Sequence, residues 1–137
     1  FIPRLDHINY IGSFDKTLEK DHLSDCQITI NRHFYNENTV YNFSKVEINY
    51  LDSIIIFCEK NQIIPILVTS PVHKCYLEKI PIHFIEKFKE IKDKYQNRCL
   101  YIEDKSIYSD SLYMNSDHLN YHGSIKFSSV LKSRINL

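Results

Sequence analysis

The sequence has little glycine, with only two glycines, one methionine and no tryptophan among 137 residues. Loops that wrap a phosphate need several glycines at fixed spacing, so two glycines exclude a glycine-rich phosphate loop. The formal net charge is zero, with 17 basic and 17 acidic residues. Nucleic-acid-binding domains usually carry a basic patch or stripe, whereas the lysines here alternate with acids. We therefore expect no nucleic-acid partner.

Long apolar runs are also missing. The longest are Ile54–Cys58 and Ile63–Val68, whereas a membrane-spanning helix needs about 20 residues. The first residues, Phe1–Arg4, lack the charged-then-apolar order of a signal peptide. We expect a soluble protein with no transmembrane segment, and the sequence leaves open whether it is cytoplasmic or associated with the cell envelope.

The four cysteines are far apart and form no Cys-x-x-Cys pair, which indicates neither a zinc knuckle nor a thioredoxin-like site. Cys58 and Cys99 lie within apolar runs, so we expect them to be small buried hydrophobic residues. Cys75 follows His73 by two positions and is a candidate nucleophile beside a base. Nothing else in that loop is typical of a cysteine protease.

From Ser44 onward, helical and strand patterns alternate. Ser44 and Glu47 form a capping box, which predicts a helix that ends near Asn61. Its apolar residues recur at helical spacing and predict a buried stripe. The stripe comprises Val46, Tyr50, Ile54 and Phe57, widened by Leu51, Ile55 and Cys58.

Two strands and two further helices follow. The run Ile63–Thr69 predicts a strand covered on both faces, provided that Pro65 falls at its start. Pro81 opens a helix that ends near Asn97, and Cys99–Asp104 is the next strand. After a polar loop at 105–119, a last helix should run from about Tyr121 to Ile135, capped by Asn120 or Ser116. The residues expected to face inward are Phe84, Phe88, Ile91 and Tyr95 in the first of these helices and Ile125, Phe127, Val130 and Leu131 in the second.

This order predicts an α/β fold, a three-layer α/β/α sandwich with a short parallel sheet, in a single domain spanning 1–137. Residues 1–43 are expected to be irregular chain wrapping over the core at 44–137, with possible short strands at His7–Ile11 and Gln27–Ile30. Ligands of such folds bind beyond the carboxyl ends of the strands. Three segments meet there: Thr69–His73, the chain after Asp104, and the Asn115–Asn120 loop.

The loop before the last helix places an amide, a carboxylate and an imidazole within four residues. Asn115 lies three residues before His118 and can reach its Nδ1–H, which would leave Nε2 free to take a proton. Asp117 is the nearest carboxylate. The alternative interpretation is a surface loop in which Asp117 merely lies near a helix N-terminus.

Histidines also suggest two other interpretations. His118 and His122 are four residues apart beside Asp117 and are a candidate metal site, although no His-Glu-x-x-His pattern is present. His73 borders the expected cleft and is a candidate for binding substrate. The other histidines are assigned to the polar surface: His7, His22, His33 and His83.

The run Asn115–Ser128 resembles the last block of the SGNH hydrolase superfamily, the GDSL-type lipases, esterases and carbohydrate O-acetyltransferases. In that block Asp-x-x-His supplies the catalytic acid and base. The helix and strand over Asn49–Pro71 are similar to those preceding the block, so the resemblance covers about residues 44–135. It implies that His118 is the catalytic base and that the reaction needs no cofactor.

Two departures from the family pattern stand out. The position of the acid holds Asn115, and Asp117 could substitute for it. The family's serine lies in a Gly-Asp-Ser turn, for which the only similar place is Gly12–Ser13. Too few residues separate Ser13 from Ser44 for the remaining strands of the family fold. We therefore expect this chain to be the C-terminal half of such a domain or a reduced relative.

The predicted function is hydrolysis or acetyl transfer at an ester of a carbohydrate or lipid, so the expected partner is a small-molecule or polysaccharide ester. A serine would attack the carbonyl, and His118, held by Asn115 or Asp117, would move the proton. The alternative is a non-catalytic binding or structural domain with an SGNH-like shell and no nucleophile.

Overall fold

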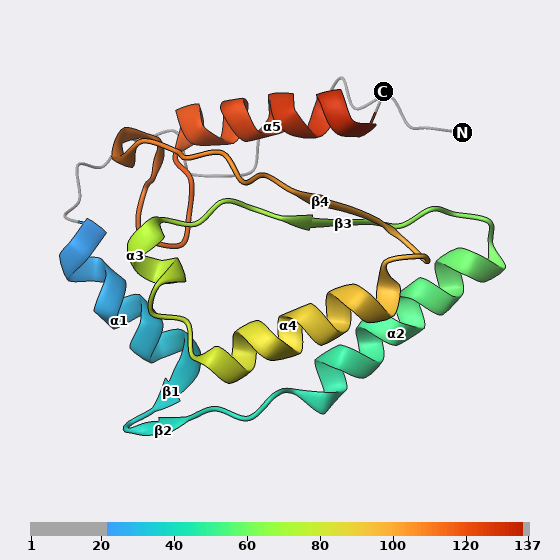
Figure 1. Ribbon diagram of the computed structural model, residues 1–137, viewed down its shortest axis with the longest axis horizontal. Helices are drawn as coiled ribbons and strands as arrows, with labels where there is room; N and C mark the ends of the chain where they lie inside the picture. Colours follow the sequence, from blue (N-terminus) through green and yellow to red (C-terminus); the bar gives the residue numbers. More distant parts are fainter. Residues whose placement is uncertain (1–21, 136–137) are drawn as a thin grey trace, which may run out of the picture.

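The computed structural model describes residues 22–135. Its elements are, in order, α1 (His22–Phe34), β1 (Tyr35–Asn36), β2 (Thr39–Val40), α2 (Lys45–Lys60), β3 (Ile66–Thr69), α3 (Lys74–Leu77), α4 (Ile82–Tyr95), β4 (Leu100–Glu103), the 3-10 turn η1 (Asp110–Leu112) and α5 (Tyr121–Ile135). Figure 1 shows β3 and β4 running between α5 on one side and α2 and α4 on the other. The fold is mixed α/β with a small parallel sheet.

The parallel sheet forms where the sequence predicts it. β3 pairs with β4 in parallel, from Ile66 opposite Leu100 to Thr69 opposite Glu103. Pro65 lies just before β3, and its carbonyl accepts the Leu100 N–H at 2.9 Å. A proline at the start of a strand removes no hydrogen bond from the sheet. Pro65 is at the start of β3, as the prediction of this strand required.

Helix α1 is the main difference from the sequence prediction. Irregular chain and a short strand at Gln27–Ile30 were expected, and both expectations were wrong for this segment. Cys26 and Ile30, four positions apart, are buried in one cluster with Cys75 and Tyr76 of α3. Because packing of one helical face outweighs the strand preference of β-branched residues, the segment is helical. Residues 35–40 then form the antiparallel hairpin of β1 and β2.

Helix α2 begins as predicted, with the Ser44 hydroxyl accepting the Glu47 N–H at 3.2 Å. It is apolar on two opposite faces. The inner face carries Ile48, Leu51, Ile55 and Cys58, of which Ile55 is fully buried. The other face, here called the outward stripe, comprises Val46, Tyr50, Ile54 and Phe57. These four side chains are 55% to 67% exposed, so the prediction that they are buried was wrong.

Polar contacts join the inner side of α2 to α4 and the turn after it. Asp52 accepts hydrogen bonds from Lys94 Nζ at 2.8 Å and from the hydroxyl of Tyr95, which is fully buried. These two bonds lower the pKa of Asp52. The guanidinium of Arg98 donates to both carboxylate oxygens of Glu59, at 2.6 and 2.8 Å.

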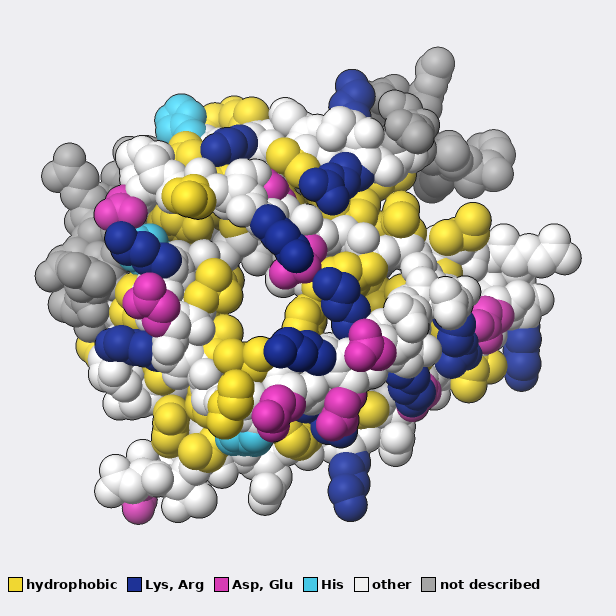
Figure 2. Space-filling model, in the orientation of Figure 1, with side chains coloured by type: hydrophobic (Ala, Val, Ile, Leu, Met, Phe, Trp, Pro, Cys, Tyr) yellow, Lys and Arg dark blue, Asp and Glu magenta, His cyan; other side chains and the backbone are white. Residues whose placement is uncertain are grey.

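Several other predicted core residues reach the surface. Cys58 and Cys99 are half-buried, while Phe88 and Ile125 are 42% and 48% exposed. Figure 2 shows hydrophobic side chains spread over the drawn face and around a hollow in its middle. Within residues 22–135, no helix combines the length and the apolar character needed to cross a membrane.

Candidate functional site

A tight hairpin presents the predicted catalytic loop. Tyr113 pairs with Leu119 in an antiparallel bridge, and the Met114 N–H donates to the His118 carbonyl at 3.0 Å. These bonds close the turn that contains Asn115–His118, so its side chains start from a fixed backbone.

Asn120 joins this hairpin to α5. Its Nδ2 donates to the Ser111 carbonyl at 2.6 Å, and its Oδ1 accepts the Gly123 N–H at 3.0 Å. Asn120 is therefore the N-cap of α5, which confirms one of the two predicted caps, Asn120 or Ser116. Ser116 is instead fully buried, and its carbonyl accepts the His73 N–H at 2.9 Å.

The predicted contact between Asn115 and His118 is present. Nδ1 of His118 lies 3.0 Å from Oδ1 of Asn115, and the same oxygen accepts the Asp117 N–H at 3.3 Å. That second bond fixes which end of the amide is oxygen. Since an amide oxygen only accepts, Nδ1 carries the proton and Nε2 of the neutral ring has a lone pair.

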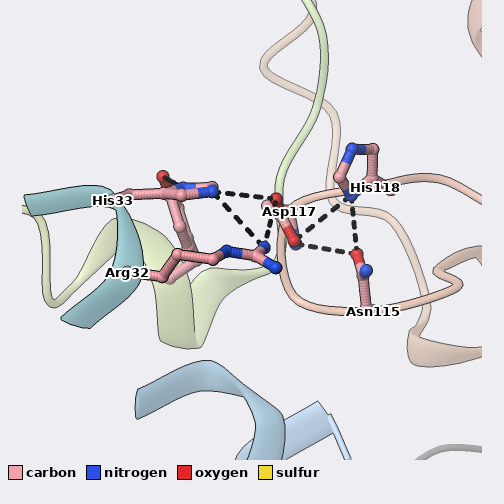
Figure 3. A network of polar contacts seen from close by, with 6 residues as sticks. Arg32, His33, Asn115, Asp117 and His118 are labelled. Atoms are coloured by element: carbon pink, nitrogen blue, oxygen red, sulfur yellow. Dashed lines mark hydrogen bonds and ion pairs between the residues drawn. The ribbon is translucent and has the colours of Figure 1, made fainter. Parts of the chain in front are cut away.

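Asp117 lies between His118 and helix α1, as Figure 3 shows. Its side chain is 7% exposed, and Oδ1 lies 3.2 Å from Nδ1 of His118. Oδ1 of Asp117 is within ion-pair distance of Nδ1 but forms no hydrogen bond with it, whereas Oδ1 of Asn115 does. The other oxygen, Oδ2, lies 3.7 Å from Nε2 of His33 and 3.9 Å from the Arg32 guanidinium. The carboxylate is therefore surrounded by three nitrogen-bearing side chains.

Sequence reasoning missed Arg32 and His33, and assigned His33 to the polar surface. His33 is further held by Tyr76, whose hydroxyl lies 2.7 Å from its Nδ1. No local spacing could have indicated these contacts, because α1 was not expected to be a helix and lies far from Asp117 along the chain.

His73 and Cys75 do not form a nucleophile and base. His73 is buried, its Nδ1 accepts the Cys75 N–H at 3.2 Å, and its Nε2 lies 3.1 Å from Oδ1 of Asp110. Both ring nitrogens are thus engaged. Burial raises the pKa of the Cys75 thiol to about 12, and the neighbouring Cys26 thiol adds to this shift. A protonated, buried thiol is a poor nucleophile, which argues against the cysteine alternative.

The imidazoles of His118 and His73 are expected to adopt opposite tautomers. At about pH 8.5, where an ordinary histidine is neutral, His118 should carry its proton on Nδ1 and His73 on Nε2. Long-range ¹H–¹⁵N spectra of histidine-labelled protein distinguish these forms, and His118→Gln and His73→Gln variants assign the signals. Each ring is the control for the other, and finding the same tautomer at both would contradict the described contacts.

A cavity of about 380 Å³ lies beyond the carboxyl ends of β3 and β4, where the fold class predicts a ligand site. Its walls include Thr69–Lys74 and Glu103–Tyr108. Two of the three predicted segments thus line it. The third, Asn115–Asn120, contributes no residue to the lining, so His118 lies outside the cavity walls.

Ser13, the candidate nucleophile, lies outside the described residues, and so does the strand predicted at His7–Ile11. His122 is exposed and its ring contacts Tyr121. In the described part of the chain, no three His, Cys, Asp or Glu side chains gather where they could hold a metal ion, so the metal interpretation through His118 and His122 gains no support.

Comparison of the chain with family models, curated proteins and solved structures found no match.

Proposed function

We propose that the chain carries the acid–base part of an ester-processing site of the SGNH type. The observation that carries the proposal is the geometry of His118. Asn115 and Asp117 both approach its Nδ1, at 3.0 and 3.2 Å, and the ring is about half exposed. An imidazole whose Nδ1–H is held by an acceptor, in a ring about half exposed, has the tautomer that general-base catalysis through Nε2 requires.

In this mechanism a serine hydroxyl attacks the acyl carbonyl and gives its proton to Nε2 of His118. His118 then returns the proton to the leaving alcohol, and backbone amides stabilise the oxyanion. Asp117 stabilises the imidazolium by charge, while Asn115 holds the tautomer. The substrate class is an acylated carbohydrate or lipid, and the acyl acceptor is water or a second alcohol. No cofactor is required.

We also propose that the sheet and its flanking helices form part of a three-layer α/β/α sandwich. Two parallel strands between helices on either side are compatible with part of a three-layer α/β/α sandwich. The outward stripe of α2 is compatible with further elements covering that face, since it leaves four large apolar side chains exposed. Ser13 is the nucleophile to test within this chain.

One observation favours the second candidate, a non-catalytic binding domain with an SGNH-like shell. The cavity is lined by residues other than His118. A domain that binds a ligand without processing it would keep that cavity and would not need the imidazole.

Reaction with a serine-directed fluorophosphonate separates the two candidates. We expect one covalent adduct on the wild-type chain by intact-mass spectrometry, and its loss in His118→Ala and in Ser13→Ala. The matched control is His122→Ala, which removes an exposed imidazole outside the network and should label normally. Absence of any adduct on the wild type would mean that the nucleophile is absent from these residues, and the chain would then be either a fragment of such a site or the binding domain.

A further inference from the structure

The cavity beyond β3 and β4 is lined mostly by apolar surface. Its apolar walls come from the loop after β3, from α3 and from the loop before α5. They are Pro71, Val72, Leu77, Ile107, Tyr108 and Tyr113. A largely apolar cavity of this size is typical of a small-molecule site.

The polar groups of the lining are mostly satisfied by the protein itself. Glu103 accepts a hydrogen bond from Lys92 at 3.2 Å. Asp104 accepts from the Tyr108 hydroxyl at 2.6 Å and from the Ser106 N–H at 2.9 Å. These carboxylates are therefore turned toward protein donors.

The two tyrosines contribute their rings. The Tyr113 hydroxyl donates to the Val72 carbonyl at 3.2 Å, as that of Tyr108 does to Asp104. Both residues are buried, at 6% and 5% exposure. Because their hydroxyls already have acceptors and their rings are almost fully buried, the two tyrosines present only a small apolar edge to the cavity.

Two lining residues are large hydrophobic side chains left in water. Ile107 is 94% exposed and Leu77 is 54% exposed. Their apolar surface would be removed from water by a ligand that extends over them, which favours binding of an apolar group. Lys74 and Lys105 are exposed lysines of the same lining and suit a carboxylate at the end of such a ligand.

The cavity is connected to the His118 hairpin through the backbone. Tyr113 both lines the cavity and begins the hairpin. The N–H of His73, another lining residue, donates to the carbonyl of Ser116. A chain bound in the cavity would therefore lie against the segments that hold His118 in place.

From these observations we infer that the cavity binds an aliphatic chain of medium length. Identifying that chain as the acyl part of the ester rests on the proposed function, whereas the binding itself does not. The inference narrows the substrate class from acylated carbohydrates or lipids in general to those whose acyl chain is of medium length.

Calorimetric titration with alkanoates from butanoate to decanoate, kept below micelle-forming concentrations, tests the inference. Each added methylene should tighten saturable one-to-one binding by about fourfold, until the cavity is filled. Affinity that does not depend on chain length would overturn the inference.

Variants place the binding in the cavity. The double variant Leu77→Asp/Ile107→Asp changes exposed side chains, so the fold should tolerate it, and it should weaken decanoate binding by about tenfold or more. Ile125→Asp, on the exposed side of α5, is the matched control and should bind normally. Equal binding by both variants would overturn the inference.

The same titration separates the cavity from the catalytic proposal. His118→Ala should bind decanoate as the wild type does. If fluorophosphonate labelling fails while chain-length-dependent binding persists, the inference about the cavity is supported and the proposed ester chemistry is contradicted. If labelling succeeds without decanoate binding, the proposed ester chemistry is supported and the inference about the cavity is contradicted.

Discussion

If the proposed ester chemistry holds, replacing Asp117 with asparagine is expected to lower kcat for ester hydrolysis by roughly 10- to 10³-fold, because the carboxylate that stabilises the imidazolium by charge is lost. The carboxylate lies 3.2 Å from Nδ1 of His118 and is almost fully buried. Because the carboxylate is buried while the imidazole is about half exposed, solvent screens their interaction only in part. An amide at this position keeps the shape and loses the charge. Steady-state rates with an activated ester measure the effect.

Asn115→Ala is the comparison for Asp117→Asn. A neutral hydrogen bond contributes about 1 kcal/mol, so this change should cost only about fivefold to tenfold. The tautomer spectrum of His118 shows whether Asp117→Asn has disturbed the loop, because the proton should stay on Nδ1 while Asn115 remains. A larger loss for Asn115→Ala than for Asp117→Asn would make Asn115 the essential partner.

Gly123→Ala is expected to destabilise the protein by about 1–3 kcal/mol or more, although alanine normally stabilises a helix relative to glycine. A Cβ at this position would lie 2.2 Å from the Leu112 carbonyl oxygen and 3.1 Å from two side-chain carbons of Leu119. The Leu112 carbonyl already accepts the Asn120 N–H at 2.9 Å. It cannot move without disturbing the cap of α5. Urea unfolding followed by circular dichroism measures the loss.

Ser128→Ala is the matched control for Gly123→Ala, since Ser128 is exposed on the same helix. It should leave the free energy of unfolding unchanged or slightly raise it. A Gly123→Ala variant as stable as Ser128→Ala would show that α5 and η1 approach each other less closely than described.

Among the elements after Ser44, α2, β3, α4, β4 and α5 were predictable because their signals are local, whereas the short helix α3 and the turn η1 were not predicted. Periodicity, a capping serine and a proline at a strand start all act within a few residues of the element they define. The contact between Asn115 and His118 was predictable for the same reason, since three residues of a tight turn fix it.

Helix α1 and its part in the site were not predictable in this way. Its helical face becomes apparent only when Cys75 and Tyr76 of α3 pack against it, and those residues come much later in the chain. The contacts of Arg32 and His33 with Asp117 depend on that packing. Nor could local periodicity show which of the two apolar faces of α2 turns inward.

Because α2 has two apolar faces, hydrophobic burial alone does not determine which of them turns toward the core. Each face carries four apolar side chains, so their number does not distinguish the two rotations. The polar pairs decide between them, because only one rotation brings Asp52 to Lys94 and Tyr95 and Glu59 to Arg98. The exposed pairs with Lys94 and Arg98 add little stability, whereas the part-buried bond from the Tyr95 hydroxyl adds more. Their effect here is to specify the rotational register of the helix, a choice that apolar contacts alone leave degenerate.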